Sequence, residues 1–136
     1  AAEAARERGA TVIAVTVLTS LDATELAAIG INVSPAEQVL RLVKLTQAAG
    51  LAGVVCSAQE ISLVKGHCGP DFLTVVPGIR PAGAAHGDQK RVMTPGEAAQ
   101  AGASHIVVGR PILAAADPAA AARAINLELA AAAGRQ

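Results

Sequence analysis

TVIAVTVLTSLDATE, residues 11–25, is the stretch from which the fold of this chain is first inferred. Its opening part, residues 11–18, is β-branched or apolar almost throughout, as expected of a parallel strand that is buried on both faces. The hydroxyl pair Thr19-Ser20 follows, and Asp22 then stands three residues before Glu25, the spacing of a helix capping box. The stretch predicts one strand–loop–helix unit of an α/β protein.

The same unit recurs along the chain. Further short apolar runs predict strands at residues 53–56, 72–76 and 105–108, and residues 1–8 are expected to be the end of a helix. Helix-start signals lie between the strands, at Ser34 with Pro35 and Glu37, at Ser57 with Glu60, at Thr94 with Pro95 and Glu97, and at Asp117 with Pro118.

Helix ends and faces follow from the same patterns. The predicted stops are the glycines at 9, 30, 50, 66 and 102, and a last alanine-rich helix is expected to run to about residue 133. The helix after Ser34 is expected to present one face made of Ala36, Val39, Leu40, Val43 and Gln47.

Alternation of strands and helices predicts a parallel sheet with right-handed crossovers. Four such units are too few to close an eight-stranded barrel, which needs roughly 250 residues. Periodicity alone leaves two architectures open, a part of a barrel and a small open sheet with helices on both faces. No linker or change of composition divides the chain, so residues 1–136 are expected to form a single domain.

Composition excludes several classes of function. The 136 residues carry 11 basic and 11 acidic side chains, so the net charge is zero, which argues against binding to nucleic acid or an anionic membrane. One Phe and no Trp or Tyr leave no platform on which single-stranded bases could stack. No apolar run reaches the roughly 18 residues of a membrane span.

The cysteines and the first residues indicate a cellular setting. Cys56 and Cys68 form no CxxC pattern, so we expect two reduced thiols in a cytoplasmic protein. The opening AAEAARERGA is helical and charged, unlike a signal peptide. Because it has no initiator Met and starts within a helix, we expect a fragment of a longer chain.

Candidate binding residues follow the predicted strands, because ligands of parallel α/β proteins meet the carboxyl ends of strands. Arg80 lies in the PGIRP sequence after the third strand, and Gly109 and Arg110 follow the fourth. The guanidinium fork matches phosphate oxygens in pairs, and a glycine lets a backbone N–H approach an anion. Either arginine alone is best explained as a surface residue, but the pair at adjacent strand ends favours a phosphate site.

The segment after Arg80 is long for a loop without its own structure. Residues 79–93 read IRPAGAAHGDQKRVM and hold Gln89 and Arg91 among small residues. Loops of more than about 12–15 residues are usually functional or disordered. A lid over a phosphate and a solvated surface loop both fit the composition.

Other chemistry has no support in the sequence. His67, His86 and His105 show no metal-ligand spacing with one another or with the cysteines, so no metal is predicted. No glycine-rich nucleotide fingerprint, Walker loop or nucleophile elbow occurs. No lysine follows a predicted strand, so the groups needed for strong acid–base chemistry are missing.

With these motifs identified, the sequence resembles the orotidine 5'-phosphate decarboxylase family in its bacterial form. The matching stretches are IAVTVLTSLD (13–22), LAGVVCSAQE (51–60), VVPGIRPAGAAHGDQKRVMTP (75–95), HIVVGRPI (105–112) and DPAAAARAIN (117–126). The resemblance covers essentially the whole chain. It implies the second half of an eight-stranded βα barrel, strands five to eight, from a cofactor-free carboxy-lyase that converts orotidine 5'-phosphate to UMP and CO2 in pyrimidine biosynthesis.

The resemblance also implies roles for five residues. Thr19, beside Ser20, is similar to the hydroxyl that contacts the nucleotide near its pyrimidine. Arg80 resembles a substrate-binding arginine at the base of the phosphate loop, and Gln89 resembles the residue that reaches over the substrate to its phosphate. Gly109 and Arg110 resemble the backbone N–H and guanidinium that hold the phosphate. A homodimer is implied for the full-length enzyme.

One departure from the family's pattern is as informative as the match. The Lys-Asp-Lys-Asp array of the family lies upstream around a DxKxxD motif, and no such motif occurs here. We therefore predict no catalytic residue and no decarboxylation by these 136 residues alone. The competing hypotheses are a non-catalytic half barrel that binds nucleotide phosphate, which would pair through its sheet edges, and a sibling barrel acting on a sugar phosphate.

Overall fold

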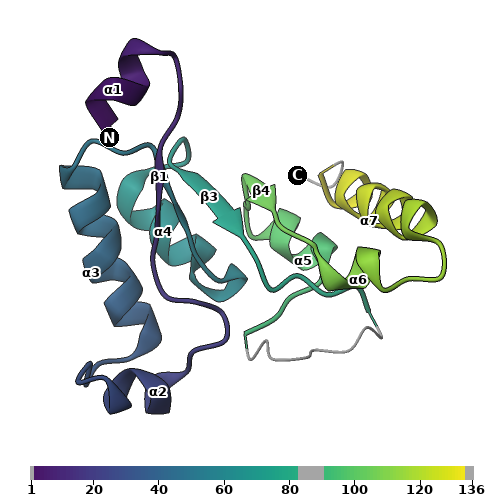
Figure 1. Cartoon of the computed structure of the whole chain (residues 1–136), viewed down its shortest axis with the longest axis horizontal. Helices are drawn as coiled ribbons and strands as arrows, with labels where there is room; N and C mark the ends of the chain where they lie inside the picture. The colour runs from purple at the N-terminus through teal and green to yellow at the C-terminus, as the bar shows by residue number, and fades with distance from the viewer. Residues whose placement is uncertain (1, 83–90, 134–136) are drawn as a thin grey trace.

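The centre of the molecule is a parallel sheet. The computed structural model describes residues 2–82 and 91–133, and within them four strands lie side by side in sequence order (Figure 1). The strands are β1 (Ile13–Val15), β2 (Gly53–Val55), β3 (Leu73–Val76) and β4 (His105–Ile106). The predicted α/β class and all four predicted strands are confirmed, although β1 and β4 are shorter than the apolar runs that contain them.

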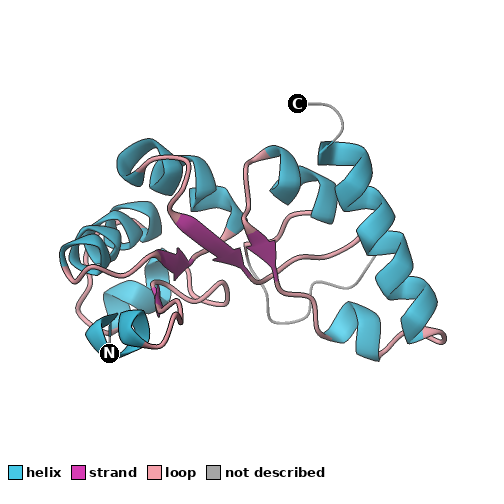
Figure 2. Ribbon diagram, turned by 90° about the horizontal axis from the view of Figure 1, so that it is seen from above, coloured by secondary structure: helices cyan, strands magenta, loops and turns pink. Residues whose placement is uncertain are grey.

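Helices connect the strands, as Figure 2 shows. They are α1 (Ala2–Glu7), α2 (Ala23–Ala28), α3 (Pro35–Ala48), the 3-10 helix η1 (Ala58–Glu60), α4 (Ile61–Cys68), α5 (Pro95–Gln100), α6 (Arg110–Leu113) and α7 (Pro118–Ala133). α6 was not expected from the sequence.

The two faces of the sheet have different surroundings. Side chains alternate between the faces of a strand, so Val54, Thr74 and Val76 share one face, and each is 0% exposed. On the other face Val15 is 60% exposed, although it pairs in register with Val55. The prediction that the first strand is buried on both faces is therefore wrong, because helices cover only one face within the described residues.

The covered face is packed in two clusters. In the first, Val39 and Val43 of α3 meet Val54 of β2 and Val64 of α4. In the second, the side chain of Ile61 from α4 packs with residues around β3 and α5, namely Val76, Ile79 and Ala98. These two clusters attach the covered face of the sheet to its helices and so fix where the strands end relative to them.

Local capping signals predict the helix starts well. Asp22 accepts hydrogen bonds from the amides of Thr24 and Glu25, and Glu25 accepts one from the amide of Asp22 in return. Thr94 and Glu97 form a second complete capping box before α5. Both boxes confirm the prediction.

Two other predicted boxes are incomplete. Ser34 caps α3 through the amide of Glu37, but the Glu37 carboxylate binds Arg41 at 2.7 Å instead of returning to Ser34. Ser57 caps η1 through the amide of Gln59, whereas the carboxylate of Glu60 turns into the interior. In each case the carboxylate of the glutamate pairs with an arginine.

Two further details differ from the sequence prediction. The buried face of α3 is Val39, Val43 and Thr46, while Ala36 and Gln47 are exposed. α4 continues through Gly66 and ends before Gly69, which has a φ of 92°. A single glycine in the second turn is tolerated because packing of the apolar face stabilises the helix.

The close approach of β2 to β3 generates a stability prediction. A Cβ at Gly53 would overlap the carbonyl oxygen of Leu73, so Gly53→Ala is expected to lower the free energy of unfolding by about 1–3 kcal/mol. Gly66→Ala is the matched control, because its Cβ meets nothing within 4 Å and alanine favours the helix by about 0.5–1 kcal/mol. Urea unfolding measures both, and a loss of stability in the two variants alike would contradict the packing argument.

Candidate functional site

The carboxyl end of β1 leads directly into a hydroxyl-bearing loop. The amide and hydroxyl of Thr16 both donate to the carbonyl of Val55, at 3.1 and 2.7 Å, which extends the pairing with β2 beyond the strand. Thr19 follows at 4% exposure, and Ser20 is half-buried. The loop is therefore held against the sheet with its hydroxyl residues at the strand end.

A glycine turn places Arg80 at the end of β3. Gly78 has a φ of 76°, a conformation that residues with a side chain disfavour, and the next residue, Ile79, is buried. The amide of Arg80 donates to the carbonyl of Met93 at 2.9 Å, and Ile79 forms a parallel bridge with Met93. One guanidinium nitrogen of Arg80 donates to the carbonyl of Ile79 at 2.8 Å, and the residue is 7% exposed.

The carboxyl end of β4 carries the second arginine. Gly109 precedes α6, whose first residue is Arg110, and both are exposed. Gly109 has a negative φ of −107°, and a Cβ built there would meet nothing within 4 Å. Packing among the described residues therefore does not require a glycine at this position, and the space beside the strand end is open.

These strand ends line one cavity of about 450 Å³, within the usual size range of ligand sites. Its polar lining consists of Thr19, Ser20, Arg80, Gly109 and Arg110. The structure thus brings together four of the five predicted site residues. The fifth, Gln89, lies outside the described residues.

The floor of the cavity is apolar. Val15 and Val55 come from the open face of the sheet, Val107 follows β4, and Leu18 and Leu113 come from the rim. Leu113 is 79% exposed and Val107 is 50% exposed. The cavity therefore combines cationic and hydroxyl groups at its edge with a broad hydrocarbon surface.

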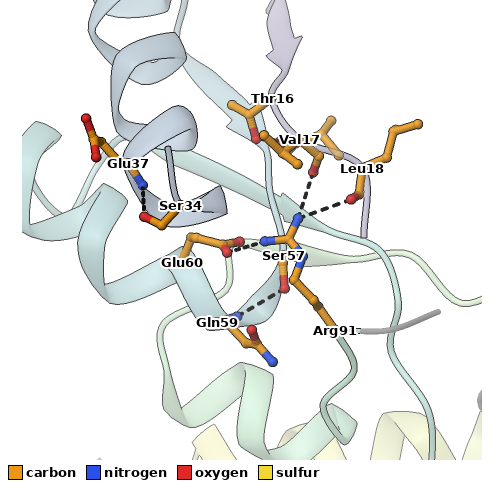
Figure 3. A network of polar contacts seen from close by, with 10 residues as sticks. Thr16, Val17, Leu18, Ser34, Glu37, Ser57, Gln59, Glu60 and Arg91 are labelled. Atoms are coloured by element: carbon orange, nitrogen blue, oxygen red, sulfur yellow. Dashed lines mark hydrogen bonds and ion pairs between the residues drawn. The ribbon is translucent and has the colours of Figure 1, made fainter. Parts of the chain in front are cut away.

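A buried ion pair lies behind the Thr19 loop. Arg91 and Glu60 are 7% and 3% exposed, and a guanidinium nitrogen of Arg91 donates to the Glu60 carboxylate (Figure 3). Burial raises the pKa of Glu60, and the positive charge of Arg91 opposes that shift. Sequence reasoning missed the pair, since Glu60 had a local explanation as a cap and its partner is 31 residues away.

Within residues 2–82 and 91–133, no group of three His, Cys, Asp or Glu side chains could hold a metal ion. In the same ranges, no helix is long and apolar enough to cross a membrane.

The chain is similar to proteins of one known family. Residues 1–125 match the model of the family described as orotidine 5'-phosphate decarboxylase / HUMPS, and the chain belongs to this family. It is 58% identical over 118 residues to orotidine 5'-phosphate decarboxylase from Vibrio parahaemolyticus, covering 87% of this chain and 51% of that protein. It is 62% identical over 120 residues to the enzyme of the same name from Gluconobacter oxydans, covering 88% of this chain and 51% of that protein.

A solved structure agrees with the assignment. The crystal structure of orotidine 5'-phosphate decarboxylase from Lactobacillus acidophilus is similar with a TM-score of 0.71 and 42% identity, covering 88% of this chain and 49% of that one. Such neighbours are eight-stranded βα barrels. The chain spans about half the length of the curated relatives it matches, so of the two architectures left open by the sequence, the part of a barrel is supported.

The two cysteine thiols differ in burial, and the difference can be tested by chemical modification. Cys56 is 1% exposed, and burial, aided by the nearby Glu60 carboxylate, raises its pKa from 9.0 to about 12, whereas Cys68 is half-buried. Iodoacetamide at about pH 8 is expected to alkylate Cys68 in the folded chain and Cys56 only after unfolding in urea, because the thiolate is the reactive form. Peptide mass mapping gives the order, and equal rates at the two thiols would contradict it.

The same pKa shift predicts a pH dependence. A pKa raised by folding disfavours the thiolate in the folded chain, so this contribution to stability is intact below pH 9.0 and is lost as the pH rises toward about 12. In the Cys56→Ala variant, the part of the loss of folding stability at high pH that comes from this thiol is expected to be absent. Urea midpoints measured from pH 8 upward, with Cys68→Ala as the control, test this.

Proposed function

We propose that this chain is the phosphate-binding half of an orotidine 5'-phosphate decarboxylase, which forms UMP and CO2 in pyrimidine biosynthesis. The four strands would correspond to strands five to eight of the barrel. The observation that carries the proposal is that Arg80, Gly109 and Arg110, from adjacent strand ends, line one cavity with Thr19. Family membership supplies the reaction.

Charge supports a phosphorylated ligand. Arg80 and Arg110 line the cavity, and no carboxylate is among its described lining residues. Two guanidinium groups at one rim suit a phosphate dianion, because each can donate paired hydrogen bonds to its oxygens. The backbone N–H of Gly109 would add a donor at the open strand end.

The remaining lining fits the rest of a nucleotide. Thr19 and Ser20 would offer hydroxyl groups to the pyrimidine, at a distance from the arginines set by the width of the sheet. Val15, Val55 and Val107 would exclude water from the sugar and base, which strengthens the polar contacts nearby. Gln89 remains a sequence-based proposal for a further phosphate contact.

The chemical step is assigned to residues that this sequence lacks. Among the described lining residues there is no Lys, His, Asp or Glu to donate a proton to a developing carbanion. The DxKxxD motif that carries this chemistry in the family is also missing from the sequence. This half would contribute binding energy, and energy from a distant phosphate can be used to orient and distort the reacting end of a substrate.

Two features of the whole protein belong to the same proposal. No cofactor is required, and the complete enzyme would act as a cytoplasmic homodimer. A non-catalytic half barrel and a decarboxylase of sugar phosphates remain the alternatives, and preference for UMP over a sugar phosphate separates the second from the main proposal.

Removing the exposed arginine tests phosphate binding. Arg110→Ala is expected to raise the Kd for UMP about 10- to 100-fold, the loss of a charged hydrogen bond, and to change the Kd for uridine little. Arg123→Ala removes the same charge from an exposed position of α7 outside the cavity and is the control. Titration calorimetry measures both ligands, and equal losses for UMP and uridine would argue against phosphate contact.

A second experiment tests whether this half binds the nucleotide without catalysing its decarboxylation. The 136-residue chain is expected to bind UMP and to release no CO2 from orotidine 5'-phosphate above the uncatalysed rate, since it lacks the lysine and aspartate array. Release of labelled CO2 measures this. Turnover that co-purifies with the chain and disappears in Arg110→Ala would show that these residues contain the catalytic groups after all.

A further inference from the structure

Arg91 holds the backbone of the loop that carries Thr19. One terminal nitrogen of its guanidinium donates to the carbonyls of Val17 and Leu18, at 3.2 and 3.1 Å. These are the two peptide groups immediately before Thr19. Figure 3 shows the guanidinium between these carbonyls and Glu60. A planar donor of this kind fixes the direction of both carbonyls and therefore the path of the chain into Thr19 and Ser20.

The Glu60 contact explains how the guanidinium is held. Glu60 ends η1, which follows β2, so the contact anchors Arg91 to a packed part of the covered face. The pair is incomplete, because Glu60 Oε2 and Arg91 Nε have no hydrogen-bond partner among the described residues. A buried ion pair with such gaps is a weak source of stability. Its geometry is better explained by orientation of the β1 loop.

The same short segment also contacts the phosphate side of the cavity. Two residues after Arg91, the carbonyl of Met93 accepts the amide hydrogen bond of Arg80 at 2.9 Å. Residues 91–93 are thus bonded through a side chain to the β1 loop and through the backbone to the β3 loop. The positions of Thr19 and Arg80 depend on one segment that contributes nothing to the cavity lining.

We infer that Arg91 is a positioning residue, which fixes Thr19 and Ser20 for the pyrimidine end of a nucleotide whose phosphate lies at Arg80 and Arg110. The inference rests on the proposed function, but its first part concerns the loop alone. Arg91 is not among the residues that line the cavity. Its substitution should affect contacts to the base more than contacts to the phosphate.

Two variants separate positioning from stability. Arg91→Met removes both carbonyl contacts and leaves Glu60 unpaired, whereas Glu60→Gln keeps the carbonyl contacts and leaves Arg91 unpaired. Both leave one buried charge without its partner, so both should lower the thermal midpoint. The measurements are made in the 136-residue chain below the midpoint of the weaker variant, as monitored by circular dichroism, and Arg91→Lys adds a charge-conserving comparison.

The first readout needs no ligand. Backbone 15N relaxation is expected to show increased motion at Thr19 and Ser20 in Arg91→Met, partial recovery in Arg91→Lys, and behaviour close to that of the unsubstituted chain in Glu60→Gln. Similar changes in Arg91→Met and Glu60→Gln would overturn the inference, because the loop would then respond only to loss of stability.

The second readout compares UMP with ribose 5-phosphate, which lacks the base. Arg91→Met is expected to raise the Kd for UMP about tenfold and to leave the Kd for ribose 5-phosphate within about threefold, while Glu60→Gln leaves both within about threefold. Equal losses for the two ligands, or equal affinity of the unsubstituted chain for both, would overturn the inference. If the unsubstituted chain binds neither, the proposed function of this chain fails, and relaxation alone decides whether Arg91 fixes the loop.

Discussion

Parallel pairing in register is the constraint on which the arrangement of this molecule depends. Ile13, Gly53 and Leu73 align as neighbours, and Val75 aligns with His105, so all four strands end at one edge of the sheet. Residues far apart in the sequence then share a cavity without contacting one another in a helix or hairpin. The same pairing requires Gly53, because a side chain there would meet the backbone of β3. Packing of the strands and placement of the candidate site therefore have one physical origin.

Structural features that depend on residues close together in the sequence are predicted correctly, whereas contacts between residues far apart in the sequence are not. The boxes at Asp22 and Thr94 were found because donor and acceptor lie within three residues of each other. The strand ends at Thr19, Arg80 and Gly109 were found because a change from apolar to polar residues marks where a buried strand stops. Their roles in binding stay predictions, whereas their shared cavity is an observation.

The misses have equally specific causes. The spacing of Glu60 from Ser57 predicts only a cap, but the Glu60 side chain is also buried and paired with Arg91. α6 is not predicted from the sequence, because a four-residue helix is too short to show a periodic pattern of apolar residues. Exposure of Val15 could not be read from an apolar run, since such a run is the same whether one face or both faces are covered. Each error concerns a partner whose position depends on the whole fold.

The exposed face of the sheet gives the candidate site its apolar floor. Val15 and Val107 are hydrocarbon side chains left exposed on a sheet whose other face is closely packed. In a barrel, that face would be the interior, and the relatives are about twice as long as this chain. Under the proposed function, an arginine at the edge of this surface would have fewer competing water molecules once a phosphorylated ligand fills the cavity, which would strengthen its attraction for the phosphate. The apolar floor and the cationic rim would then act together, and the contribution of each arginine to binding would depend on how completely the sheet is covered.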